Sequence, residues 1–277
     1  MPNIDHAALA HALMPAVLKA GACLLDHRAQ GVTAETKRDG SPVSRADREA
    51  EQIVLDALAQ VAPGVPVIAE EAVSAGRIPS FDAAAVRVEA LDGTREYIKG
   101  GDDFTVNVAL VEHGFPVFGI LLAPASGRLF ATLGPRRAAA AQVAPESLAM
   151  SRTPQFHDIA TVAPGPEGMR VLSSRSHRSA ETDAFLSKFR VARQDHLGSS
   201  LKFGIIAAGE ADFYPRLGPT SAWDIAAGHA ILAAAGGTVT RLDGTPLTYL
   251  DKSRIGALDP FLNPSFIAWG RAGTIPR

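Results

Sequence analysis

Residues 104–133 constrain the fold most, because three apolar segments follow one another there with only short turns between them. The stretch reads FTVNVALVEHGFPVFGILLAPASGRLFATL, with turn residues at His113-Gly114 and at Ser126-Gly127. Such short connections join antiparallel strands, since parallel strands need a long crossover. We therefore expect three antiparallel strands of one sheet.

Helices and further strands are expected before this meander. Apolar residues recur at helical spacing over residues 4–28 and 45–61. Ser44 precedes the second helix and Asp47 follows three residues later, which predicts a capping box. The segments VPVIAEE (65–71) and VRVEALD (86–92) are predicted to be short buried strands that end in acidic residues.

The pattern changes after a weakly patterned stretch, rich in Pro, Ala and Ser, at residues 134–168. Beyond it, short strands and helices alternate. We expect an α/β protein with two domains, an α+β lobe over residues 1–140 and an α/β lobe over residues 141–277. The expected strands there are MRVLSS, DFYPRL, TVTRL and SFIAWG, and the expected helices are one from about Ser179, GSSLKFGIIAAGEA and SAWDIAAGHAILAAAGG.

Composition narrows the functional class. The 277 residues carry a net charge of -2 and no basic block, so we expect no nucleic-acid partner. The apolar runs are short and broken by charge, so no integral membrane segment is expected. Asp5 and His6 stand where a signal peptide would have basic residues. The single cysteine, Cys23, excludes an intrachain disulfide and a thiolate metal cluster and is expected to be a core thiol, and a reducing cytoplasm is the expected location.

Carboxylates gather at the ends of predicted strands and at helix starts. Each alone is also explained as a helix cap or a solvated turn. In an α/β architecture, however, strand ends meet at one crevice, where several carboxylates repel one another unless a cation neutralises them. Oxygen ligands favour Mg²⁺ over zinc, and paired Mg²⁺ ions serve displacement at phosphorus. The residues in question are Asp47, Glu70, Glu71, Glu89, Asp92 and Asp224.

Several motifs carry a family resemblance over nearly the whole chain. The segments KRDGSPVSRAD, LDGTREYIKGGDDFTVNVAL, SSRSH, GSSLKFGIIAAGEADFYPRLGPT and WDIAAGHAILAAAGG occur in the order and spacing of the inositol monophosphatase superfamily. They resemble most its CysQ-type 3'(2'),5'-bisphosphate nucleotidases. The resemblance implies a layered αβαβα sandwich of the sugar-phosphatase type. It also implies a lithium-sensitive, Mg²⁺-dependent enzyme of sulfur metabolism that removes the 3'-phosphate from adenosine 3',5'-bisphosphate, giving AMP and phosphate.

The resemblance also implies roles for individual residues. Thr94 and Asp47 match the pair that activates the nucleophilic water. Where the family usually has DPLDGT this chain has EALDGT, so the first acid, Glu89, is one methylene longer than usual. Two or three Mg²⁺ ions are implied, and the matching ligands are Glu70, Glu89, the carbonyl oxygen of Leu91, Asp92 and Asp224.

The predicted substrate contacts separate this branch from the inositol phosphatases. By resemblance, Ser199, Lys202 and Arg216 contact the nucleotide and its second phosphate, and His177 lies near the base. Gly93 lets the backbone approach an anion, beside Thr94. Two alternatives stay open, an inositol or sugar monophosphatase of the same superfamily and a non-catalytic nucleotide-sensing protein. The sequence leaves the oligomeric state open.

Overall fold

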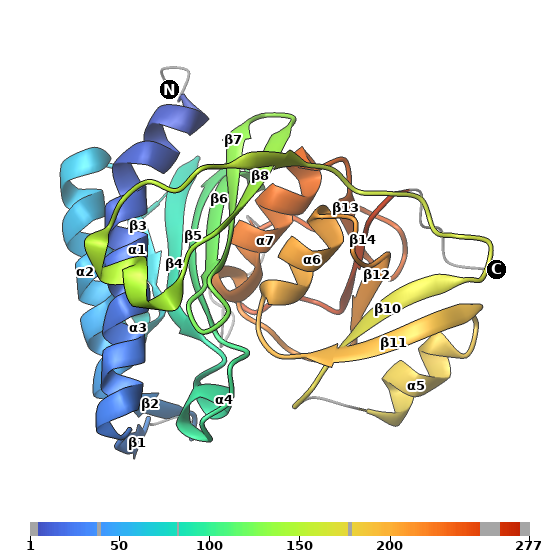
Figure 1. Cartoon of the computed structure of the whole chain (residues 1–277), viewed down its shortest axis with the longest axis horizontal. Helices are drawn as coiled ribbons and strands as arrows, with labels where there is room; N and C mark the ends of the chain where they lie inside the picture. The colour runs from blue at the N-terminus through green and yellow to red at the C-terminus, as the bar shows by residue number, and fades with distance from the viewer. Residues whose placement is uncertain (1–4, 38–39, 82, 177–178, 250–260, 272–277) are drawn as a thin grey trace.

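The computed structural model describes residues 5–37, 40–81, 83–176, 179–249 and 261–271. Five layers stack across the molecule: two helices, a seven-stranded sheet, two helices, a five-stranded sheet and one helix (Figure 1). This is the αβαβα sandwich that the family resemblance implied.

The first sheet has the strand order β3-β4-β5-β6-β7-β8-β9. β3 and β4 pair in parallel, and all the later neighbours pair antiparallel. The predicted meander of three strands is confirmed as β5, β6 and β7. The bounds are β3 Val67–Ala69, β4 Ala84–Asp92, β5 Thr105–Glu112, β6 Phe115–Ala123, β7 Arg128–Gly134, β8 Arg137–Gln142 and β9 His157–Ile159.

The second sheet has the order β11-β10-β12-β14-β13. β10 pairs in parallel with β11 and β12, whereas β14 pairs antiparallel with β12 and β13. The bounds are β10 Met169–Ser174, β11 Val191–Leu197, β12 Phe213–Arg216, β13 Thr238–Arg241 and β14 Phe266–Trp269.

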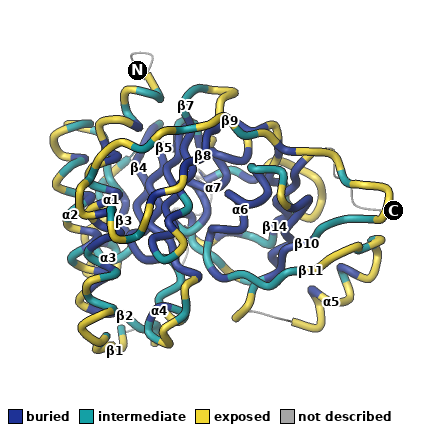
Figure 2. The backbone as a smooth tube through the Cα atoms, viewed as in Figure 1, coloured by how far each residue is buried: buried dark blue, intermediate teal, exposed yellow. Residues whose placement is uncertain are grey.

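The described residues form three apolar cores between the layers. α1 (His6–Gln30) and α2 (Arg45–Val61) cover the outer face of the first sheet. α6 (Leu201–Ala207) and α7 (Ala222–Ala234) fill the space between the two sheets, where nearly every side chain of both helices is buried. α5 (Ala180–Leu186) packs on the far face of the second sheet. Figure 2 shows the central strands of the first sheet and the helices α6 and α7 as buried, whereas the edge strands β9 and β11 are intermediate or exposed.

Four short elements and one 3₁₀ turn complete the described chain. β1 (Ala34–Thr36) and β2 (Pro42–Ser44) form a separate two-stranded ribbon. α3 (Glu70–Ser74) follows β3 and α4 (Thr94–Ile98) follows β4, so each short helix begins where a strand of the first sheet ends. A 3₁₀ turn spans Pro145–Met150.

Several sequence expectations need correction. The boundary at residue 140 falls inside β8, and β9 still belongs to the first sheet, so a division between lobes fits better near residues 160–168. The two-domain division itself stays a prediction. β11 was not predicted, and α6 is shorter than the expected helix over residues 198–211.

The expectation that every apolar run is too short to span a membrane is wrong for α1. This helix, His6–Gln30, is long and apolar enough to cross a membrane. Its apolar face, which includes Leu13, Val17 and Leu24, is instead buried against α2 and the first sheet. A buried core helix can have the same length and composition, so these properties of α1 are weak evidence for a membrane-spanning segment.

Candidate active site

An irregularity at the end of β4 brings two acidic side chains to the same cavity. In a regular strand, residues 89 and 92 would point to opposite faces of the sheet. Here Glu89 pairs with Asn107 but Asp92 pairs with Thr105, so three steps along β4 match two along β5. Such a bulge re-aims side chains, and Glu89 and Asp92 both line the cavity.

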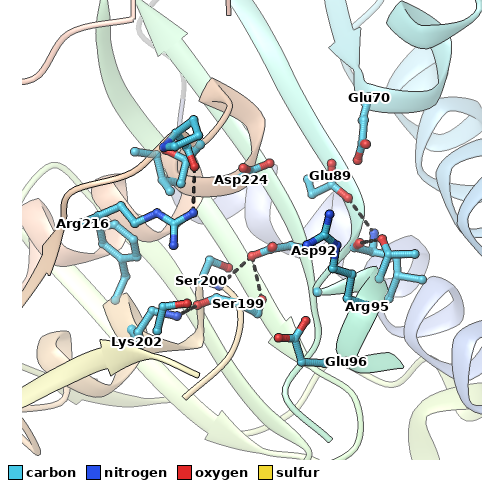
Figure 3. Close-up of a pocket in the computed structure, with 18 of the residues that line it drawn as sticks. Glu70, Glu89, Asp92, Arg95, Glu96, Ser199, Ser200, Lys202, Arg216 and Asp224 are labelled. Carbon is cyan, nitrogen blue, oxygen red and sulfur yellow. Dashed lines mark hydrogen bonds between the residues drawn. The ribbon is translucent and has the colours of Figure 1, made fainter. Parts of the chain in front are cut away.

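Two more carboxylates reach this cavity from helix starts. Glu70 is the first residue of α3, and Asp224 lies in the first turn of α7, where its Oδ2 accepts a hydrogen bond from Ser221 N at 2.8 Å. Figure 3 shows Glu89, Asp92 and Asp224 directed toward a common space, with Glu70 beyond Glu89. The cavity has a volume of about 260 Å³. Its lining includes Glu70, Glu89, Leu91, Asp92, Gly93, Thr94, Ser199, Lys202, Arg216 and Asp224.

The electrostatics of this cluster favour a bound cation. Burial raises the pKa of Glu89 well above its ordinary value, and the neighbouring carboxylates of Glu70, Asp224 and Asp92 raise it further. The same two causes, burial and then Asp92 and Glu70, raise the pKa of Asp224. Glu89 Oε2 is buried and has no hydrogen-bond partner among the described residues. An unpaired buried carboxylate oxygen in an oxygen-only donor set fits Mg²⁺.

Asp92 is held in place by the loop before α6. Its Oδ2 accepts hydrogen bonds from Ser199 Oγ at 2.7 Å and from Ser200 N at 2.6 Å. Ser199 adopts a left-handed backbone conformation with φ 56°, which is uncommon for a residue with a side chain. Ser199 was predicted as a substrate contact, which stays a prediction; in this structure its hydroxyl group orients Asp92. Ser200 was missed, because a serine in a polar loop carries no sequence signal of its own.

Thr94 and Asp47 are joined across two elements. Thr94 Oγ1 lies 3.2 Å from Asp47 Oδ1 and 3.1 Å from the carbonyl oxygen of Leu91, and it can donate its hydrogen to either. Asp47 Oδ2 accepts from Ser44 N at 2.7 Å and from Ser44 Oγ at 2.6 Å, so the predicted capping box is confirmed. Burial raises the pKa of Asp47. The cap therefore leaves one oxygen of Asp47 directed at Thr94.

Gly93 is required by the backbone at the turn into α4. Its φ of 95° lies in the left-handed region, and a Cβ added there would stand 2.7 Å from the carbonyl oxygen of Asp103. The strand can therefore turn into α4 within one residue, which places Thr94 at the cavity wall.

Lys37 is a charged neighbour that the sequence did not reveal. Its Nζ lies 2.6 Å from Glu70 Oε1 and 2.6 Å from Glu71 Oε1. Burial raises the pKa of Glu71 to about 7, although the ion pair with Lys37 opposes this shift. Lys37 follows β1, thirty-three residues before Glu70, so only the fold brings the two together.

Lys202 and Arg216 form the opposite wall of the cavity, away from Glu70 (Figure 3). Both are buried, which rules out their being surface charges. Lys202 Nζ donates to the carbonyl oxygens of Leu197 and Ser199 and lies 4.8 Å from the ring centre of Tyr214. Burial lowers the pKa of Lys202 to about 8.

Arg216 uses only part of its guanidinium group. Its Nη2 donates to the carbonyl oxygen of Pro219 at 2.7 Å, and its buried Nε has no partner within the described chain. In the part of the chain that the structure describes, neither Arg216 nor Lys202 forms an ion pair with a carboxylate within 4.0 Å. Within the described chain, the cavity thus has carboxylates on one side and, on the other, two cations that have no carboxylate partner.

The predicted site residues that the structure describes therefore come together. The predicted metal ligands and substrate contacts that the structure describes all line the cavity, and Asp47 reaches it through Thr94. His177 lies outside the described residues. The roles assigned to these residues stay predictions.

The whole chain, with its fold and cavity, can be compared with known protein families. The model of the inositol monophosphatase family matches residues 5–269, nearly the whole chain. The chain belongs to the inositol monophosphatase family.

Individual relatives narrow the similarity to one branch. The chain is 37% identical over 231 residues to 3'(2'),5'-bisphosphate nucleotidase CysQ of Escherichia coli K12, covering 83% of this chain and 86% of that protein. It is 32% identical over 263 residues to the CysQ of Buchnera aphidicola, covering 90% and 89%. The crystal structure of CysQ from Bacteroides thetaiotaomicron superposes with a TM-score of 0.76 at 29% identity, covering 98% of this chain and all of that one. The Thermotoga maritima IMPase, at 23% identity and a TM-score of 0.70 with 92% and 89% coverage, shares the fold.

Proposed function

We propose that this protein is a Mg²⁺-dependent phosphatase that removes the 3'-phosphate of adenosine 3',5'-bisphosphate and releases AMP and phosphate. The observation that carries the proposal is the pair of buried cations, Lys202 and Arg216, opposite the carboxylate cluster. A substrate with two phosphates needs a second anion site besides the reacting one. Arginine suits that task because its planar fork binds phosphate through two hydrogen bonds.

Lys202 and Arg216 carry positive charges that repel each other, so a bound anion would stabilise both of them. Burial lowers the pKa of Lys202 most; Asp92 opposes this shift, and the nearby positive charge of Arg216 adds to it. A phosphate between the two cations would relieve that repulsion and could accept from Arg216 Nε, which has no partner among the described residues. An inositol or sugar monophosphate has no second phosphate to bind there.

Glu70, Glu89, Asp92, Asp224 and the carbonyl oxygen of Leu91 would hold the Mg²⁺ ions. When bound, these ions would lower the pKa of the attacking water and stabilise charge on the leaving oxygen. Ser199 and Ser200 keep Asp92 in position for this role. The number of ions, two or three, follows from the family resemblance.

Thr94 and Asp47 would receive the proton of the attacking water. Thr94 Oγ1 can accept that proton while it passes its own hydrogen to Asp47 Oδ1, 3.2 Å away. The raised pKa of Asp47 makes this carboxylate a better proton acceptor than an exposed aspartate. Ser44 fixes the other oxygen of Asp47, so the accepting oxygen stays directed at Thr94.

A second cavity beside the first supports the proposal, because a nucleoside could occupy it. It has a volume of about 350 Å³, and it shares Ser174, Arg216 and Pro219 with the active-site cavity. Arg216 therefore lies between the two spaces. This position suits a residue that binds the phosphate on the far end of a nucleotide.

Phosphate release tests the proposal against both alternatives. We expect Mg²⁺-dependent release from adenosine 3',5'-bisphosphate to exceed release from inositol 1-phosphate at equal concentration. We expect Asp92→Asn to lose activity by orders of magnitude while its unfolding temperature stays near that of the parent. Preference for inositol 1-phosphate would support the monophosphatase alternative, and binding without Mg²⁺-dependent turnover would support the nucleotide-sensing one. A reducing cytoplasm stays our prediction for its location, based on the single cysteine.

A further inference from the structure

The two outer helices carry a second cluster of metal-ligating side chains. Cys23 and His27 are one turn apart on α1, and Glu49 lies on the neighbouring α2. One ligand atom from each of the three lies within 4.8 Å of the others. None of them lines the active-site cavity. The cluster is therefore separate from the proposed magnesium site.

Cys23 was expected to be a core thiol, and the structure corrects this. The residue is only partly buried, and it lines a cavity of about 550 Å³ at the surface of α1 and α2 together with His27, Glu49 and Asp26. The cluster lies where α1 and α2 run side by side on the outside of the first sheet (Figure 1). An ion could reach these side chains from solvent, because the His27 and Glu49 side chains are 24% and 40% exposed.

We propose that Cys23, His27 and Glu49 bind a Zn²⁺ ion that links α1 to α2. Thiolate, imidazole and carboxylate are the usual protein ligands of zinc, whereas Mg²⁺ prefers oxygen alone. A thiolate and a carboxylate balance the two charges of the ion, and neutral His27 adds none. Three protein ligands leave a fourth position for water, or for Asp26 in the same cavity.

The side chains need only small movements to take up this arrangement. With Zn–S near 2.3 Å and Zn–N or Zn–O near 2.0 Å, tetrahedral ligands stand roughly 3.3–3.6 Å apart. His27 Nε2 and Glu49 Oε2 are now 2.7 Å apart as a hydrogen-bonded pair, so they must separate slightly while Cys23 Sγ approaches. Glu49 Oε1 pairs with Arg45, which leaves Oε2 for the ion.

The chain offers a spectroscopic test, because Cys23 is its only cysteine. The full-length protein is stripped of metal with a chelator, saturated with Mg²⁺ and titrated with Co²⁺, which substitutes for zinc and is coloured. A thiolate-to-cobalt charge-transfer band can then arise from Cys23 alone. We expect this band to saturate at one equivalent, with tetrahedral ligand-field bands, and to disappear when Zn²⁺ is added.

Variants distinguish a site formed by all three side chains from metal binding by the Cys23 thiol alone. Cys23→Ser should abolish the band. His27→Gln and Glu49→Gln should each weaken Co²⁺ binding about tenfold or more, since even outer-sphere partners of a metal contribute that much. His11→Gln, an exposed histidine on the same helix, and Asp92→Asn, in the active site, should leave the band unchanged. Far-ultraviolet circular dichroism without metal checks that each variant is folded.

Two results would overturn the proposal. One is the lack of a charge-transfer band in the folded parent protein. The other is a band that keeps its parental affinity in both His27→Gln and Glu49→Gln, which would mean that Cys23 binds cobalt without its neighbours. As a second measurement, Zn²⁺ in the presence of Mg²⁺ should raise the unfolding temperature of the parent but not of Cys23→Ser.

Discussion

The burial of Glu89 is the strongest indication, at the level of a single residue, that the cavity binds a cation. It is the first acid of EALDGT, it is almost fully buried, and one of its carboxylate oxygens has no partner among the described residues. Burying a charge without a partner is costly, so the side chain is destabilising unless a cation joins it. The free energy cost of burying the Glu89 carboxylate is thus evidence that this residue binds a cation.

Substitutions at Glu89 should separate charge from length. We expect Glu89→Asp to keep or raise Mg²⁺-dependent activity, because the carboxylate remains and matches the shorter acid that is usual in the family. We expect Glu89→Gln to lose about a hundredfold or more, since a direct ligand should contribute at least as much as the tenfold to hundredfold of an outer partner. Steady-state kinetics at saturating Mg²⁺ measure both.

Stability provides the control for this pair. Without Mg²⁺, Glu89→Gln should unfold at a temperature at least as high as the parent, because a neutral amide replaces a poorly solvated acid. An active Glu89→Gln would remove Glu89 from the site. A marked loss of stability would mean that the carboxylate has a structural role instead.

At the scale of elements, α7 connects the two sheets and carries Asp224 into the cavity. The helix is apolar around its whole circumference and is packed between both sheets. It approaches β6 so closely that a Cβ added to Gly119 would stand 2.3 Å from the carbonyl oxygen of Ala227. The position of Asp224 therefore depends on a glycine in a distant strand.

Gly119→Ala should destabilise the protein through this contact. Overpacking of a tight core costs about 1–3 kcal/mol, and here the obstacle is backbone that cannot rotate away. We expect a lower unfolding temperature and a reduced Mg²⁺ affinity, because α7 must shift. Gly134→Ala in β7 is the matched control, since its Cβ would meet only an ordinary contact with Arg137 at 3.5 Å. Equal stability of the two variants would refute the close-contact argument.

His229, also on α7, should make the protein sensitive to acid. Burial lowers its pKa from 6.5 to about 3, and its Nδ1 lies 3.0 Å from Tyr249 Oη. Between these pH values the unfolded chain binds a proton that the folded chain does not. His229 therefore reduces stability as the pH falls from about 6.5 to about 3, by up to about 1.4 kcal/mol per pH unit.

Denaturant unfolding at a series of pH values measures this effect. The stability of His229→Gln should depend less steeply on pH in this window, whatever its stability at neutral pH. His11→Gln, an exposed histidine on α1, should keep the parental slope. Identical slopes for His229→Gln and the parent would show that His229 is not kept neutral.

Much of the fold could be predicted from elements with strong local signals. The capping box and apolar spacing of α2 predicted Arg45–Val61 as the structure has it, and two short turns predicted β5, β6 and β7. β8 was missed because its sequence, RAAAAQ, has no strand preference, and pairing with β7 imposes the extended form. The bulge in β4 and the contact of Lys37 with Glu70 depend on tertiary pairing, which no local pattern records.

At the scale of the whole molecule, the active site joins charges of opposite sign from different layers. β4, with α3 and α7, supplies carboxylates, whereas α6 and β12 supply Lys202 and Arg216. The predicted ligands could be found by resemblance, because Glu89, Asp92 and Asp224 lie in recognisable motifs and Glu70 lies at the end of the strand segment before them. Only the three-dimensional structure shows that these ligands converge on one cavity and that both cations are buried.

The central claim is that Arg216 binds a phosphate that is not cleaved, and one ratio tests it most directly. The measurement is kcat/KM on adenosine 3',5'-bisphosphate divided by kcat/KM on adenosine 3'-phosphate, for the parent and for Arg216→Ala. A charge-assisted hydrogen bond contributes about 1.5–3 kcal/mol. The ratio should therefore fall by about tenfold to hundredfold in Arg216→Ala, with little change on the monophosphate. An unchanged ratio, whether both efficiencies fall together or neither does, would contradict the bisphosphate assignment.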